Sequence, residues 1–69
     1  MEDKIQRILQ ELEAKKKRIS KTADMAEQEA KQAEYRDEEE YAYDVVYKCG
    51  IMIETIDCVI KVIQQINKE

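Results

Sequence analysis

The chain has 69 residues, with 12 Lys or Arg, 16 Asp or Glu, no His, no Pro and a single Gly. A chain this short holds one domain, and it lacks the turn residues that a β-sandwich or β-barrel needs between its strands. Without His, it also lacks the commonest general base and the commonest neutral metal ligand.

Charged residues make up 41% of the chain and hydrophobic residues 43%. This composition is typical of long amphipathic helices. The most apolar stretch, residues 45–66, is interrupted by four charged residues: Lys48, Glu54, Asp57 and Lys61. Because a membrane span needs about 18–20 nearly uncharged residues, we predict no transmembrane segment.

The first residues show no basic-then-apolar export signal, so we expect a cytoplasmic protein. In a reducing compartment, Cys49 and Cys58 should remain thiols. They lie nine positions apart, which places them on opposite sides of one helix and prevents a disulfide within that helix. We interpret both as small hydrophobic residues.

Apolar residues recur at alternating spacings of four and three along both halves, which predicts two long helices. In the first half, only Lys16 breaks the rhythm of Ile5, Leu9, Leu12, Ile19, Ala23, Ala26, Ala30 and Ala33. In the second half, the rhythm is unbroken through Val45, Cys49, Met52, Ile56, Val59, Ile63 and Ile66. We therefore predict a single domain over 1–69, with helices at about 2–34 and 38–68 and a turn at about 35–37.

The two rhythms differ in register by one residue, which marks a break near residues 37–40. There, Asp37 followed by Glu40 forms a variant of the capping box that starts a helix. The segment has no Gly or Pro, so a continuous helix with a stutter remains an alternative.

An antiparallel hairpin pairs large residues far from the turn and small ones near it. Leu9 then meets Ile63, for example, and Ala30 meets Ala42. The one mismatch is Lys16, whose stem would have to pass Ile56 to reach water.

The two helices carry unequal numbers of large aliphatic residues: six in the first and eleven in the second. A second stripe, Val46, Ile53 and Ile60, recurs every seven residues and would lie opposite polar residues of the first helix. We therefore predict that this stripe is buried in a second copy of the chain. The fold class is then all-α, a two-helix hairpin that dimerises into a four-helix bundle.

Charge is concentrated in two segments. Residues 1–22 carry seven basic and four acidic groups, and residues 23–44 carry two basic and nine acidic groups. The basic residues 15–18 fan around a helix without interleaved aromatics, which favours a solvated surface over a nucleic-acid site. The acidic residues 34–44 lack a Gly-containing loop, so helix capping and solubility are favoured over a metal site, and no cofactor is predicted.

Glu54 and Asp57 form an E-x-x-D pair that resembles half of the metal motif of MazG-like nucleotide pyrophosphatases, which are dimeric helical bundles. The upstream E-E-x-x-E half of that motif is absent: Ala42 or Tyr43 stands where its last Glu is required. We also expect both carboxylates to face water. The sequence therefore predicts no catalytic residues and a protein that is not an enzyme.

Four tyrosines crowd the turn end of the second helix: Tyr35, Tyr41, Tyr43 and Tyr47. Tyr43 and Tyr47 share a face with Gly50, and tyrosine is enriched where proteins meet partners. This face is a candidate partner surface, with Gly50 allowing close approach of another chain. The alternatives are rings that cover nearby alanines, Tyr41 above all, and a glycine that is merely tolerated.

Residues 37–61 combine an acidic turn, the run from Tyr41 to Tyr43, Gly50 and an Ile-rich segment. This pattern resembles the second helix of small uncharacterised coiled-coil hairpin proteins of low-GC Gram-positive bacteria and their prophages. The resemblance implies a hairpin and a mobile-element origin, and it carries no known activity.

These patterns favour a non-enzymatic protein–protein interaction module, a self-associating hairpin that acts as a small regulator or assembly factor. One alternative is an adaptor whose second helix binds a different protein. A degenerate Mg²⁺-dependent nucleotide hydrolase and a nucleic-acid binder are further alternatives.

Overall fold

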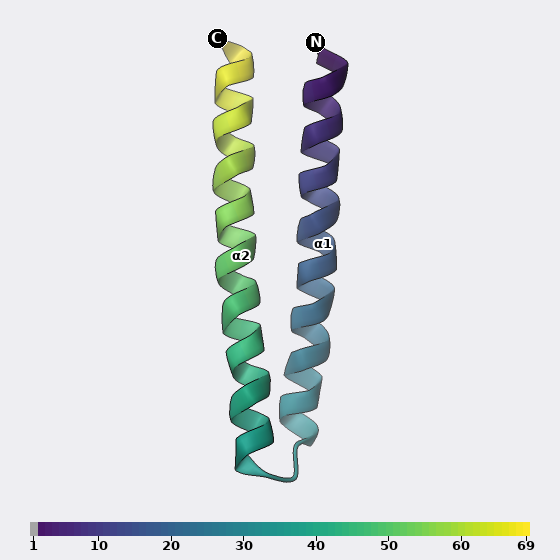
Figure 1. Ribbon diagram of the computed structural model, residues 1–69, viewed down its shortest axis with the longest axis vertical. Coiled ribbons are helices and arrows are strands. Elements are labelled where there is room, and N and C mark those ends of the chain that lie inside the picture. Colours follow the sequence, from purple (N-terminus) through teal and green to yellow (C-terminus); the bar gives the residue numbers. More distant parts are fainter. Residues whose placement is uncertain (1) are drawn as a thin grey trace.

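The computed structural model shows two long helices that lie side by side and run in opposite directions (Figure 1). Helix α1 spans Glu2–Gln32 and helix α2 spans Arg36–Lys68. The structure describes residues 2–69, with side chains from residue 3 onward, and Met1 of the predicted domain lies outside the described residues. The predicted all-α helical hairpin is confirmed, and both ends of the chain lie at the same end of the hairpin.

The turn covers residues 33–35, two residues earlier than the sequence predicts. The amide of Ala33 donates a hydrogen bond to the carbonyl of Ala30 at 3.4 Å, which closes the last turn of α1. The amide of Glu39 donates to the carbonyl of Tyr35 at 3.2 Å, which opens α2.

The predicted cap at Asp37 is wrong. Tyr35 occupies the cap position in an extended conformation, with φ −115° and ψ 144°, and no side chain caps the helix. The carboxylates of Asp37, Glu38 and Glu39 instead lie in the first turn of α2, where negative charge stabilises the helix dipole. The acidic run therefore lies inside α2 and not before it.

Packing between the helices is tight only near the turn. We call residues 23–49 the turn half and residues 2–22 and 50–69 together the open half. Among residues 3–69, five are buried, four in the turn half and Ile60 in the open half: Ala26, Ala30, Ala42, Cys49 and Ile60. The small side chains of the turn half let the two backbones approach closely, as the sequence predicts.

The hairpin is elongated and exposes much of its surface. Its extents are 52 × 15 × 10 Å and its radius of gyration is 15.9 Å, whereas a compact domain of this length has a radius of about 11 Å. No large side chain among the described residues is fully buried. The hairpin therefore has a seam between its helices but almost no core.

The face that α2 turns toward α1 differs from the predicted one. Met52, Val59 and Ile66, which the sequence places in the seam, are exposed. The predicted seam residues Val45, Cys49, Ile56 and Ile63 do lie on the side that packs on α1. The apolar residues of that side are buried or half-buried, and they comprise Ala42, Val45, Val46, Cys49, Ile53, Ile56, Ile60 and Ile63. Relative to the prediction, α2 is thus rotated about its own axis.

An ion pair between the helices accompanies this rotation. The Nζ of Lys16 lies 2.5 Å from the Oδ1 of Asp57. About a quarter of the Lys16 side chain remains exposed, so its stem lies in the seam while its ammonium group reaches water and Asp57 together. On the same side of α2 as Asp57, Ile53 and Ile60 lie inward, whereas Val59 lies outward.

Candidate interaction surface

A row of uncharged side chains runs along the exposed side of α2. We call it the free seam, and it consists of Met52, Thr55, Val59, Val62 and Ile66. Its residues are spaced by three and four, the spacing at which one helix packs along another. The four apolar members are between 43% and 63% exposed. Helix α2 therefore carries two seams, one packed on α1 and one facing solvent.

Thr55 fits this apolar row because its hydroxyl is already satisfied. The Oγ1 of Thr55 donates a hydrogen bond to the carbonyl of Ile51 at 2.9 Å. A hydroxyl bonded within its own helix can be covered by another chain without losing its only partner. The whole free seam can consequently be buried at little polar cost.

The stripe formed by Val46, Ile53 and Ile60 lies elsewhere than predicted. Ile60 is only 5% exposed in the single chain, and Val46 and Ile53 are half-buried. The expectation that α1 leaves this stripe uncovered is wrong, because these three residues lie on the side of α2 that packs on α1. That these residues contact a second copy stays a prediction.

Part of α1 lies on the same broad face of the hairpin as the free seam. Met25 of α1 and Tyr41 of α2 line one shallow hollow between the helices. Counting back by sevens from Met25 leads to Arg18 and Glu11, and counting forward by sevens from Tyr41 leads to Lys48 in the turn half and then to Thr55 and Val62. Residues seven apart lie on nearly the same side of a helix, so Glu11 and Arg18 flank the free seam.

This part of α1 is charged, unlike the free seam. We call it the α1 strip, and it consists of Ile8, Glu11, Lys15 and Arg18, which line one shallow hollow together with their neighbours Arg7 and Leu12. All four residues of the strip are exposed. One broad face of the open half therefore has an apolar side on α2 and a charged side on α1.

The predicted partner surface at Tyr43, Tyr47 and Gly50 is exposed on α2. A Cβ added at Gly50 would have no heavy atom within 4 Å, so packing inside the hairpin does not require a glycine there. A role for these residues in binding a partner stays a prediction.

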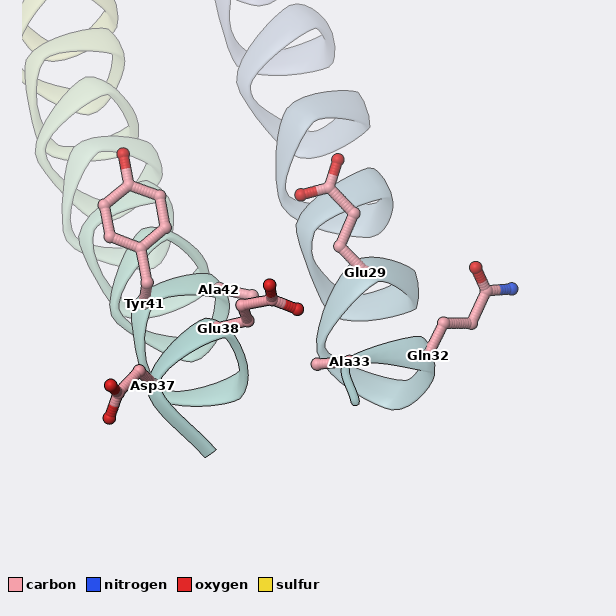
Figure 2. A pocket seen from close by; sticks show the side chains of 7 residues that line it. All are labelled: Glu29, Gln32, Ala33, Asp37, Glu38, Tyr41 and Ala42. Carbon is pink, nitrogen blue, oxygen red and sulfur yellow. The ribbon is translucent and has the colours of Figure 1, made fainter. Parts of the chain in front are cut away.

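Asp37 and Glu38, two of the acidic residues between 34 and 44, line an open pocket at the turn end (Figure 2). Ala33, the first residue of the turn, and Ala42 of α2 line the pocket, and Glu38 points toward α1 whereas Asp37 points away from it. Among residues 2–69, no three or more His, Cys, Asp or Glu side chains are placed to hold one metal ion.

Glu54 and Asp57 lie in different environments. Glu54 is exposed, but Asp57 is half-buried and engaged by Lys16, so the expectation that both face water is wrong for Asp57. The hydrogen bond to Asp57, reinforced by its charge, raises the pKa of the Lys16 amine above its usual 10.5, although partial desolvation opposes this. Asp57 therefore takes part in the contact between the two helices.

The two cysteines occupy different environments: Cys49 is buried in the turn half and Cys58 is exposed, and both are free thiols. Within residues 2–69, neither helix has a stretch apolar enough to cross a bilayer.

Comparison with known proteins returned no matching family model, curated protein or solved structure. Function therefore has to be inferred from the surface of the hairpin itself. The free seam is the feature that sequence reasoning missed. The signal that could have revealed it is Lys16, the one charged residue in the apolar stripe of α1. A lysine there favours an acidic partner on α2. Asp57 is the neighbour of Ile56, which is the residue expected opposite Lys16.

Proposed function

We propose that this protein is a non-enzymatic protein–protein interaction module, a helical hairpin that forms a homodimeric four-helix bundle in the cytoplasm and acts as a small regulator or assembly factor. The resemblance of residues 37–61 to prophage-encoded hairpins extends the proposal to a mobile-element origin. A second copy would cover the free seam, so the contact surface that we propose is Met52, Thr55, Val59, Val62 and Ile66.

The observation that carries this proposal is the excess surface of the single hairpin. Its accessible area is 6061 Å². A compact monomer of 8.2 kDa exposes about 4,500 Å², so the excess is roughly 1,500 Å². A stable interface of standard size buries about 800 Å² on each partner. An interface of that size would remove about half of the excess, and an obligate dimer interface of about twice that area would remove all of it.

The location of the exposed apolar residues supports the same proposal. The turn half buries four of the five buried residues, whereas the open half buries Ile60 alone and carries the free seam. Burying apolar area stabilises by about 25 cal/mol per Å², so a partner along the free seam adds stability where the hairpin has least.

Dimerisation can be tested by measuring the molar mass in solution with light scattering. We expect the wild type to have twice the mass of one chain, 8.2 kDa. Val59→Asp should reduce the mass to that of one chain, because it places a charge in the middle of the free seam. Gln65→Asp introduces the same charged residue at an exposed position of α2 outside the free seam and should leave the dimer intact.

A wild type that is a folded monomer would contradict self-association. A monomer that is partly unfolded and co-purifies with another protein would point instead to the adaptor.

The non-enzymatic part of the proposal is supported by Asp57. Its carboxylate holds the ammonium group of Lys16, so it is not free to pair with Glu54 as a metal ligand. Hydrolysis of nucleoside triphosphates by the purified protein with Mg²⁺ would overturn this part.

A further inference from the structure

The two sides of the interaction face constrain how two copies can pack. The free seam on α2 is uncharged, and the α1 strip beside it carries Glu11, Lys15 and Arg18. In a symmetric dimer built face to face, the two-fold axis lies between the copies, either along the helices or across them. The two cases place different helices in contact.

If the axis runs along the helices, both turns lie at the same end and α2 of each copy packs on α1 of the other. The free seam would then cover the partner's Glu11, Lys15 and Arg18. Burying charged groups against aliphatic side chains is costly. The two acidic turn halves, where residues 23–44 carry nine acidic and two basic groups, would also lie side by side and repel.

If the axis runs across the helices, the turns lie at opposite ends, α2 packs on the partner's α2, and α1 packs on the partner's α1. The free seam is then buried against itself. The middle of the free seam is Val59, so burial is largest when the axis passes through Val59. Met52 then lies opposite the partner's Ile66, and Thr55 lies close to the partner's Val62.

The same axis sets the register of the α1 strip. Because Lys16 contacts Asp57, the level of Val59 along the hairpin corresponds to the turn of α1 that contains Glu13. Glu11 and Lys15 lie at equal distances on either side of Glu13. The axis through Val59 therefore brings Glu11 opposite the partner's Lys15, and Lys15 opposite the partner's Glu11.

Only the crosswise arrangement, in which the two-fold axis runs across the helices, pairs Glu11 with the partner's Lys15. Exposed ion pairs contribute little to affinity, but they discriminate between registers and orientations. The crosswise arrangement also places the two acidic turns roughly 70 Å apart, at a rise of about 1.5 Å per residue, so their repulsion is screened by salt.

We infer that two copies pack antiparallel about a two-fold axis through Val59, with only their open halves overlapping and their acidic turn halves projecting at opposite ends. This inference rests on the proposed dimerisation and specifies its geometry. The open half, which cannot bury its apolar residues alone, forms a four-helix core, and each turn half remains a two-helix arm. The projecting arms carry Tyr43 and Tyr47, so the candidate partner surface stays accessible in the dimer.

The orientation can be tested by disulfide cross-linking in a Cys49→Ala, Cys58→Ser background whose dimeric mass is checked first. A disulfide needs Cα atoms about 5.5–6 Å apart. Mild oxidation should therefore link Val59→Cys to itself across the axis. Met52→Cys alone should not link, because its two copies lie about 21 Å apart. Met52→Cys mixed with Ile66→Cys should link the two chains.

Charge exchange provides a second test that needs no cysteine. Glu11→Lys should raise the dissociation constant of the dimer about three- to tenfold, because two exposed ion pairs become repulsive. Adding Lys15→Glu should restore the dissociation constant to within about twofold of the wild type, by re-forming both pairs in reverse. Glu34→Lys, the same charge change at the turn, should have a smaller effect than Glu11→Lys because it lies outside the overlap.

Failure of this geometry can be distinguished from failure of dimerisation. A wild type with the mass of one chain, and no cross-link in any variant, would overturn both proposals. A wild-type dimer in which Met52→Cys links to itself, or in which Lys15→Glu fails to rescue Glu11→Lys, would overturn the antiparallel arrangement alone.

Discussion

At the scale of single residues, Lys16 of α1 and Asp57 of α2 form the one ion pair that joins the two helices among the described residues. Lys16 is the one charged residue in the α1 stripe, and its Nζ lies 2.5 Å from the Oδ1 of Asp57 and 3.9 Å from the Oε2 of Glu13. The hydrogen bond to Asp57 raises the pKa of Lys16 above 10.5. The protonated amine is therefore held more firmly in the folded chain than in the unfolded one.

This pKa shift predicts a loss of stability at alkaline pH. The stabilisation is fully present below the unfolded pKa of 10.5, and it is lost as the pH rises through the higher folded pKa. Lys16→Met removes the titrating group. Urea unfolding at a series of pH values above about 9.5 should therefore show a steeper decline in the free energy of unfolding for the wild type than for Lys16→Met.

Lys48, whose pKa is raised by its hydrogen bond to Asp44, titrates in both proteins and cancels in the comparison. Equal declines in the two proteins would contradict a role for the Lys16–Asp57 contact in the seam.

Gly50 provides a second prediction at the residue scale. It lies inside α2, where glycine costs about 0.5–1 kcal/mol relative to alanine, and a Cβ there meets open space. Gly50→Ala should therefore raise the free energy of unfolding by about 0.5–1 kcal/mol, measured by urea unfolding. A variant that is less stable than the wild type would show that another chain approaches Gly50 closely in the folded protein.

At the scale of secondary-structure elements, the sequence predicts α1 better than α2. The stripe from Ile5 to Ala33 lies along the seam as expected, since the other face of α1 is polar. In α2 both possible seams are apolar, so the heptad rhythm alone does not show which one packs on α1. The ion pair between Lys16 and Asp57 lies on the side that packs on α1, and the spacing of apolar residues alone does not predict it.

The boundaries of the turn show a second limit of prediction from sequence. Residues 33–35 contain no Gly or Pro, so no single residue type marks where the chain reverses. The acidic residues from Asp37 onward suit a cap and a first turn equally well, because both use the positive end of the helix dipole.

Close packing of the turn half gives a prediction at this scale. Ala42 is 4% exposed and lies between the helices in the turn half. Ala42→Leu should destabilise the protein by about 1–3 kcal/mol, because the larger side chain forces the helices apart. Gln65→Leu, at an exposed position of α2, serves as the control in the same urea experiment. Equal effects of the two substitutions would mean that the alanine contact does not hold the turn half together.

At the scale of the whole molecule, the hairpin divides into two unlike halves. The turn half is narrow, acidic and closed by alanines and Cys49, and the open half exposes the free seam. Ordering a residue costs about 1.5 kcal/mol of conformational entropy. Among residues 3–69, Ile60 is the one large side chain that is buried, so the proposed association would add stability that a single hairpin has little means to supply. Folding and dimerisation are therefore coupled in this account.

The most direct test of this central claim is the concentration dependence of thermal unfolding, followed by circular dichroism. If the folded state is a dimer, mass action should raise the melting midpoint steadily across about a 100-fold range of concentration, and helix content at low temperature should fall at the most dilute end. A midpoint that stays constant across that range would show that a single hairpin is stable on its own, and would contradict the account.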